Sequence, residues 1–210
     1  MKCSVLILVL CLGCGVLAYA DTFALGGAST AGFYQGTLNG EAARGWDFRV
    51  NASDIDITSL AINSYASGRT TVTLWDIATR SQLAQVAINA VGGSWTPVKL
   101  STPVPLVNGN QYAVIGWADN PDDCWYSFQF GPPAGFHPTG TIQYLDTRYG
   151  NSIDADTFPM ATLTSYMYGV PDIGYVPHID VDSPVIVPEP SCLALVGAGL
   201  AGLWGRHRGK

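Results

Sequence analysis

The stretch "TTVTLWDIATRSQLAQVAI", Thr70–Ile88, decides the fold class. In its first half, Val72 and Leu74 alternate with threonines, which is the period-two pattern of a strand with one face in a core. The turn-forming residues of "IATRS" (Ile77–Ser81) separate this run from a second one that is rich in strand-forming residues. The stretch therefore predicts a β-hairpin.

Similar short runs occur on both sides of the hairpin, rich in Val, Ile, Thr and aromatic residues and bounded by Gly, Pro, Asn, Asp or Ser. The run Tyr112–Trp117 is apolar on both faces and predicts a central strand, and Asn108-Gly109 before it predicts a tight turn. The expected strands cover residues 45–50, 55–62, 70–77, 82–88, 95–100, 111–118, 124–130, 141–146 and 161–168, with a last edge strand expected soon after Tyr168. No long helical period interrupts them, so the sequence predicts an all-β, antiparallel β-sandwich or jelly-roll-like domain over residues 21–176.

Charge and cysteine content limit what this domain can be. The segment 21–187 carries fifteen acidic and six basic residues, a net charge of −9. Such a domain repels phosphate backbones, so we expect no nucleic-acid partner. Cys124 is the single cysteine of this segment, which predicts no internal disulfide and no zinc site. Stability must then come from a hydrophobic core.

The first twenty residues, "MKCSVLILVLCLGCGVLAYA", have the pattern of a secretory leader. Lys2 is followed by an apolar run, and the segment ends in Ala18-Tyr19-Ala20, the small-x-small pattern that signal peptidase cuts. The sequence predicts a signal peptide that is cleaved after Ala20. Lipidation at Cys14 remains an alternative, because a small residue precedes this cysteine.

The last residues, "VPEPSCLALVGAGLAGLWGRHRGK" (Val187–Lys210), follow a proline-rich linker at 177–187. Their apolar run, 192–205, would form a helix of about 21 Å, shorter than the ~30 Å of a bilayer's hydrocarbon core. It cannot be extended backwards, because prolines precede it. The basic tail, 206–210, stays on the cytoplasmic side of a membrane. These features predict a temporary membrane association through the C-terminal helix.

The VPEP motif, the short apolar helix and the basic tail, together with a signal peptide, resemble the PEP-CTERM sorting signal of Gram-negative bacteria. The resemblance implies recognition by an exosortase-type membrane peptidase, cleavage near Pro-Glu-Pro and delivery to the cell surface or extracellular matrix. The resemblance does not say at which residue the cut occurs. Two residues depart from the pattern, because His207 and Gly209 interrupt the basic tail. The residues that match the signal are Val187, Pro188, Glu189, Pro190, Arg206, Arg208 and Lys210.

A second resemblance concerns the domain itself. "GWDFRVN" (Gly45–Asn51), "VTLWD" (Val72–Asp76) and "TPVPLVNGNQYAVIGW" (Thr102–Trp117) are similar to a bacterial extracellular β-sandwich domain of unknown function. The similarity covers residues 23–120. It implies a fold and brings no catalytic residues with it.

Loop residues supply the candidates for catalysis and metal binding. His137 and His178 have no nucleophile motif near them, so we expect no enzyme activity. Asp119, Asp122 and Asp123 lie in one turn and offer oxygen ligands of the kind that Ca²⁺ takes, although solvated turn aspartates are the simpler interpretation. We expect no other cofactor.

Aromatic residues are the candidates for ligand binding. Trp75, Trp95 and Trp125 could offer ring faces to a pyranose, and alternation places Trp75 on the face of its strand opposite to Val72 and Leu74. Aromatic side chains more often fill sandwich cores, however. The sequence thus favours an exported structural or adhesive protein of the cell envelope or matrix, which could contact exopolysaccharide. The alternative is a carbohydrate-binding or carbohydrate-active module with Ca²⁺ in its end loops.

Overall fold

The computed structural model describes residues 20–26, 34–37, 42–51, 53–64, 67–118, 124–129, 140–164, 166–168 and 171–179, with the backbone alone at 34–37, 124–129 and 166. All of them except Ile179 belong to one compact unit, which ends at His178. Within these residues the chain is all-β and its strand pairs are antiparallel, which confirms the expected class.

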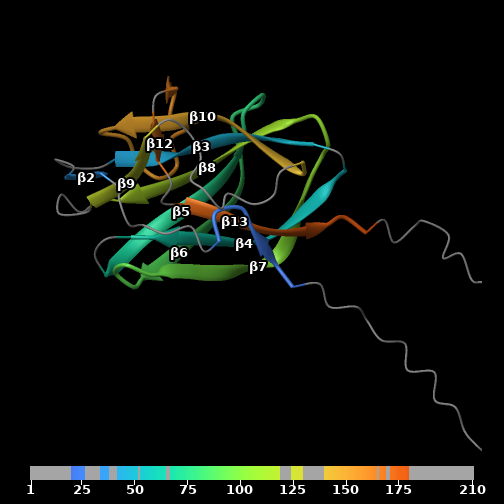
Figure 1. Cartoon of the computed structure of the whole chain (residues 1–210), viewed down its shortest axis with the longest axis horizontal. Coiled ribbons are helices and arrows are strands. Elements are labelled where there is room, and N and C mark those ends of the chain that lie inside the picture. Colours follow the sequence, from blue (N-terminus) through green and yellow to red (C-terminus); the bar gives the residue numbers. More distant parts are fainter. Residues whose placement is uncertain are drawn as a thin grey trace, which may run out of the picture. The chain divides into compact units, whose positions relative to one another are not determined.

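The described strands form three sheets (Figure 1). The four-stranded sheet has the order β1-β13-β4-β7, the six-stranded sheet β11-β10-β3-β8-β5-β6, and the three-stranded sheet β12-β9-β2. The bounds are β1 Thr22–Phe23, β2 Tyr34–Thr37, β3 Ala42–Val50, β4 Ile55–Asn63, β5 Gly68–Asp76, β6 Ser81–Ala90, β7 Trp95–Leu106, β8 Gln111–Ala118, β9 Cys124–Gln129, β10 Ile142–Asn151, β11 Ala161–Leu163, β12 Tyr166–Tyr168 and β13 Pro171–Pro177.

One main hydrophobic core joins the sheets into a β-sandwich-like fold. Trp46 and Val114 contribute from the six-stranded sheet, Leu60 and Ile173 from the four-stranded sheet, and Met167 from β12. All five side chains are buried, and alternate residues of each strand supply them. The alternation that predicted strands in the sequence is therefore the same pattern that builds the core.

Local features of the sequence are found where they were expected. The hairpin β5–β6 turns through residues 77–80, with Arg80 at a positive φ of 56°. Gly109 also has a positive φ, 86°, in the turn before β8. Strand β8 lies between β3 and β5, so the prediction of a central strand is confirmed.

Two strand predictions need correction. The run expected at 161–168 is two short strands, β11 and β12, which belong to different sheets. The last strand is not an edge strand, because β13 lies between β1 and β4. The physical reason is the N-terminal segment: Thr22 and Phe23 pair with β13 and cover the side that would otherwise be the edge.

Strands β6 and β7 follow each other along the chain but belong to different sheets. Each lies at an edge, and the turn 91–94 joins them. In the ladder with β4, Val104 lies opposite Ile57 whereas Lys99 lies opposite Ser59, so residues 100–103 have no ladder partner on β4. This irregular stretch of β7 faces β6 across a groove.

Candidate functional site

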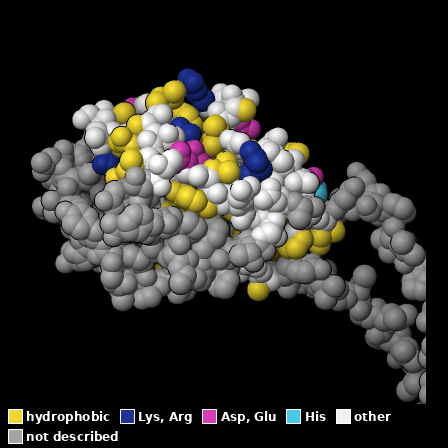
Figure 2. All heavy atoms as spheres, turned by 45° about the horizontal axis from the view of Figure 1, so that its top comes forward, with side chains coloured by type: hydrophobic (Ala, Val, Ile, Leu, Met, Phe, Trp, Pro, Cys, Tyr) yellow, Lys and Arg dark blue, Asp and Glu magenta, His cyan; other side chains and the backbone are white. Residues whose placement is uncertain are grey.

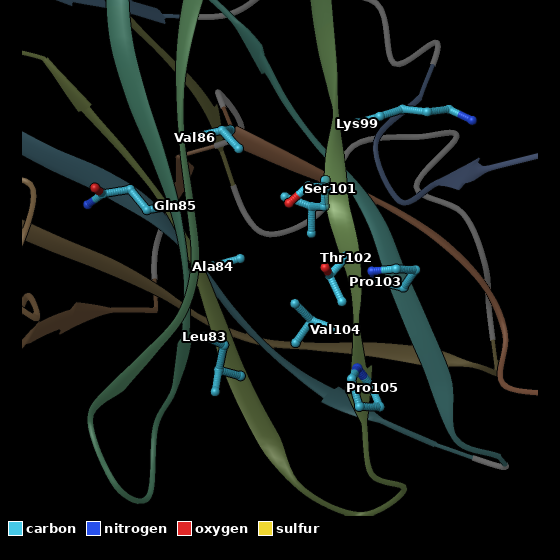
Figure 3. Close-up of a pocket in the computed structure, with 11 residues that line it drawn as sticks. Leu83, Ala84, Gln85, Val86, Lys99, Ser101, Thr102, Pro103, Val104 and Pro105 are labelled. Atoms are coloured by element: carbon cyan, nitrogen blue, oxygen red, sulfur yellow. The ribbon is translucent and has the colours of Figure 1, made fainter.

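The groove between β6 and β7 is the candidate site (Figure 3). Residues 83–86 of β6 form one wall and residues 99–105 of β7 form the other. Its volume is about 560 Å³, which falls in the range of ligand-binding clefts. Figure 3 shows Ala84, Val86 and Val104 directed into the space between the strands, whereas Lys99 points away from it.

The walls of the groove are the partly exposed margin of the main core. Leu83, Ala84, Val86, Leu100 and Val104 pack against buried core residues but keep some exposed surface. The sandwich is thus open along this side. When a ligand covers apolar surface of this kind, the binding free energy becomes more favourable by about 25 cal/mol for each Å² removed from water.

The backbone of the two walls differs. Among the described strands, β6 has a ladder partner on one side alone. Ser81–Ala90 contains neither proline nor a charged residue, so every residue of the strand has a backbone N–H to donate. Strand β7 carries Pro97, Pro103 and Pro105, which have no backbone N–H. An extended chain entering the groove could therefore hydrogen-bond to β6 and make apolar contacts with β7.

The chemistry of the groove suits binding better than catalysis. Its described lining residues include no carboxylate, histidine or cysteine. General acid–base catalysis and nucleophilic catalysis need such groups within reach of a substrate. The groove offers shape, apolar surface and the hydroxyl groups of Ser101 and Thr102.

The three candidate tryptophans lie on three different sheets, so no single sheet face carries them all. Trp75 on β5 is directed away from the main core, as its alternation with Leu74 predicted, yet it is 4% exposed. The loop after β10 covers it, and the ring of Phe158 lies 5.5 Å from the Trp75 ring, edge-on. Trp95 is half-buried at the start of β7 against the main core. Of Trp125, the position on β9 is described and the side chain is not.

The same loop covers a buried ion pair that the sequence did not suggest. Nε and Nη2 of Arg148 on β10 donate to the two carboxylate oxygens of Asp47 on β3, at 2.7 and 2.6 Å. Nη1 donates to the Pro159 carbonyl at 2.9 Å, and the guanidinium lies 4.6 Å from the centre of the Phe158 ring. Burial raises the pKa of Asp47, and the bonds from Arg148 oppose that shift. Both strands carry several charged residues, and nothing in the sequence indicated that Asp47 and Arg148 would pair across 101 positions.

The described loop carboxylates serve the fold. Asp154 accepts from the Asp156 N–H and from the Thr157 hydroxyl, and Asp156 accepts from Nε2 of Gln85 at 2.9 Å. No group of three or more His, Cys, Asp or Glu side chains among the described residues is arranged to hold a metal ion. The predicted Ca²⁺ ligands Asp119, Asp122 and Asp123 lie outside the described residues.

The two histidine predictions differ in outcome. His137 lies outside the part of the chain that the structure describes. His178 follows β13, and its Nδ1 lies 2.8 Å from Oδ1 of Asp56 in an exposed pair.

On the face shown in Figure 2, described acidic and basic side chains lie interspersed with hydrophobic ones.

Most of the predicted sorting residues also lie outside the described part. This holds for Cys14, Ala18, Val187, Pro188, Glu189, Pro190, Arg206, Arg208 and Lys210. Ala20 is described and exposed, and Asp21 follows it at the start of the sandwich. Within the residues that the structure describes, no helix has the length and apolar character needed to cross a bilayer.

Comparison with known proteins adds no family. The chain matches no family model, and no curated protein is similar enough to count as a relative. The sequence pattern and the site geometry are therefore the only guides to the function of this chain.

Proposed function

We propose that this chain is an exported protein of the Gram-negative cell envelope or extracellular matrix, sorted and cut by an exosortase, whose β-sandwich is structural or adhesive. The observation that carries the proposal is the order of segments: a leader, a compact β domain, a proline-rich linker, the VPEP motif, an apolar run and a basic tail. Each segment matches a step of export: signal peptidase, folding outside, membrane retention and cleavage.

The adhesive part of the proposal is supported by the groove between β6 and β7. It is apolar, uncharged apart from Lys99 at its margin, and free of acid–base groups among its described lining residues. A domain with a net charge of −9 repels other acidic surfaces, so close contact is easiest at an uncharged face. A protein or polymer segment that lies along this groove would hold the domain in a matrix.

Binding of exopolysaccharide is the second part to test. Sugar-binding sites use exposed aromatic faces, and two of the three candidate tryptophans offer little of that surface, because Trp75 is buried and Trp95 is half-buried. Titration of the protein with polysaccharides, followed by tryptophan fluorescence, distinguishes the two functions. A saturable change would support the carbohydrate-binding alternative, whereas no change with any glycan would favour contact through the groove.

Sorting is tested by the intact mass of the exported protein from a host that has an exosortase. We expect a product that begins at Asp21 and lacks the residues after the VPEP motif. Glu189→Ala should leave the C-terminal segment in place, whereas Asp182→Ala, a matched change outside the motif, should be processed normally. A mature product that still ends at Lys210 would refute exosortase processing.

A further inference from the structure

The N-terminal segment Asp21–Leu25, called here the N-terminal strap, is tied to the four-stranded sheet at several points. The Asp21 carboxylate accepts from the hydroxyls of Thr58, at 2.8 Å, and Ser59, at 2.5 Å. Thr22 and Phe23 pair with β13. Leu25 at the end of the strap is fully buried in the main core, so the strap is part of the folded domain.

Asp172 on β13 is the residue that holds the inner end of the strap. The backbone N–H of Leu25 donates to both oxygens of its carboxyl group, Oδ1 at 3.0 Å and Oδ2 at 2.9 Å. Oδ1 also accepts from the N–H of Ile173 at 2.8 Å. The side chain of Asp172 thus spans from its own strand to the strap, although 147 positions separate it from Leu25.

The carboxyl group of Asp172 has no exposed surface. Five elements around Asp172 carry other titratable or charged groups. These are Asp21 on the strap, Tyr175 on β13, Asp56 on β4, Tyr112 on β8, and Arg44, Asp47 and Arg49 on β3. Asp56 lies beside His178, and Arg44 donates to the carbonyls of Ala43 and Gly150. Burial raises the pKa of the neighbouring Tyr175 phenol, and a negative charge on Asp172 would raise it further.

We propose that Asp172 makes the N-terminal strap a pH-sensitive latch, which is closed while this carboxyl group is neutral and opens when it is ionised. A neutral carboxyl group still accepts both N–H donors through Oδ1, so closure does not need the charge. An ionised carboxylate in this site is cut off from water, which is costly. When the strap leaves, water reaches Asp172 and the charge is solvated.

The direction of the pH effect follows from burial. Burial raises the pKa of Asp172 to about 8 in the closed state, against about 3.9 for an exposed aspartate. The strap is therefore held most firmly below pH ~4, and the opening constant rises by up to about tenfold per pH unit until pH ~8, where it levels off. Opening makes β13 the edge of its sheet and uncovers the site that Leu25 fills.

Hydrogen exchange of the full chain, purified in detergent, measures this opening. Protection factors for the amides of residues 22–26 should fall between pH 5 and pH 8 and stay constant above it. The amides of β8 serve as the internal reference. They exchange through global unfolding, which also exposes Asp172, so their protection factors should fall with the same slope from a higher value. A strap whose protection does not change with pH, or equals that of β8 at every pH, would overturn the latch.

Two variants identify the titrating group. In Asp172→Asn the protection of residues 22–26 should no longer depend on pH, because Asn does not ionise. Asp21→Asn weakens the outer tie of the strap and should lower protection equally at every pH, with the same slope as the parent chain. An unchanged slope in Asp172→Asn would assign the effect to another group. If Asp172→Asn does not fold, the protection factors of the strap and of β8 in the parent chain and in Asp21→Asn still test the latch.

Discussion

The ion pair of Asp47 and Arg148 allows a quantitative test of how the loop after β10 is held. Asp47→Ala would leave a buried guanidinium without its two bonds to the carboxylate. Breaking one partner of a buried pair costs ~3–5 kcal/mol. Arg148 keeps the Pro159 carbonyl and the Phe158 ring, so we place the loss of unfolding free energy at the lower end, about 3 kcal/mol. A domain has ~5–15 kcal/mol in total, so this loss is large.

Urea unfolding at pH 7, followed by tryptophan fluorescence, measures the loss as a shift in midpoint at constant m-value. The matched control is Asp56→Ala, which removes the exposed partner of His178 and should cost below ~1 kcal/mol. The double variant Asp47→Leu with Arg148→Met should recover most of the stability, because no charge is left buried. A loss for Asp47→Ala no larger than that for Asp56→Ala, or a double variant less stable than either single variant, would contradict this role of the ion pair.

Two further predictions concern backbone packing and the groove. Gly45→Ala would place a Cβ against the backbone of β8 and should destabilise the domain by at least ~1–3 kcal/mol, whereas Gly68→Ala, at an open position, should change the thermal midpoint little. Equal midpoints for the two variants would contradict the close approach of β3 and β8. Leu83→Asp adds a charge to the groove and should reduce retention of the protein at the cell surface, measured by fractionation, whereas Gln82→Asp, at an exposed position beside it, should not. Normal retention of Leu83→Asp would remove the groove from the adhesive function.

The sequence was informative where structure depends on near neighbours. Val72 and Leu74 alternate with threonines whatever lies around them, and Asn108-Gly109 turns the chain by its own backbone preference. Such signals predicted the hairpin β5–β6 and the central strand β8. They could not place β13, because its position depends on a ladder with Thr22 and Phe23 at the other end of the domain.

The candidate site shows the same limit. The face of Trp75 was predicted from alternation, but its burial depends on Phe158, which lies 83 positions away in a loop. The groove arises because β6 and β7, which are neighbours in the sequence, join different sheets. The prolines of β7 indicate an edge strand, but no residue of β6 or β7 indicates that the two strands belong to different sheets.

The position of β13 has a consequence for the order of folding. A chain that leaves a ribosome or a membrane channel N-terminus first can pair β5 with β6 early, since a four-residue turn joins them. Strand β1 has no ladder partner until residues 171–177 emerge, because β13 separates it from β4. Leu25 therefore stays exposed to solvent until nearly the whole domain has left the ribosome or the channel. Completion of the four-stranded sheet is thus the final step, and the chain is most open to proteases and aggregation just before it.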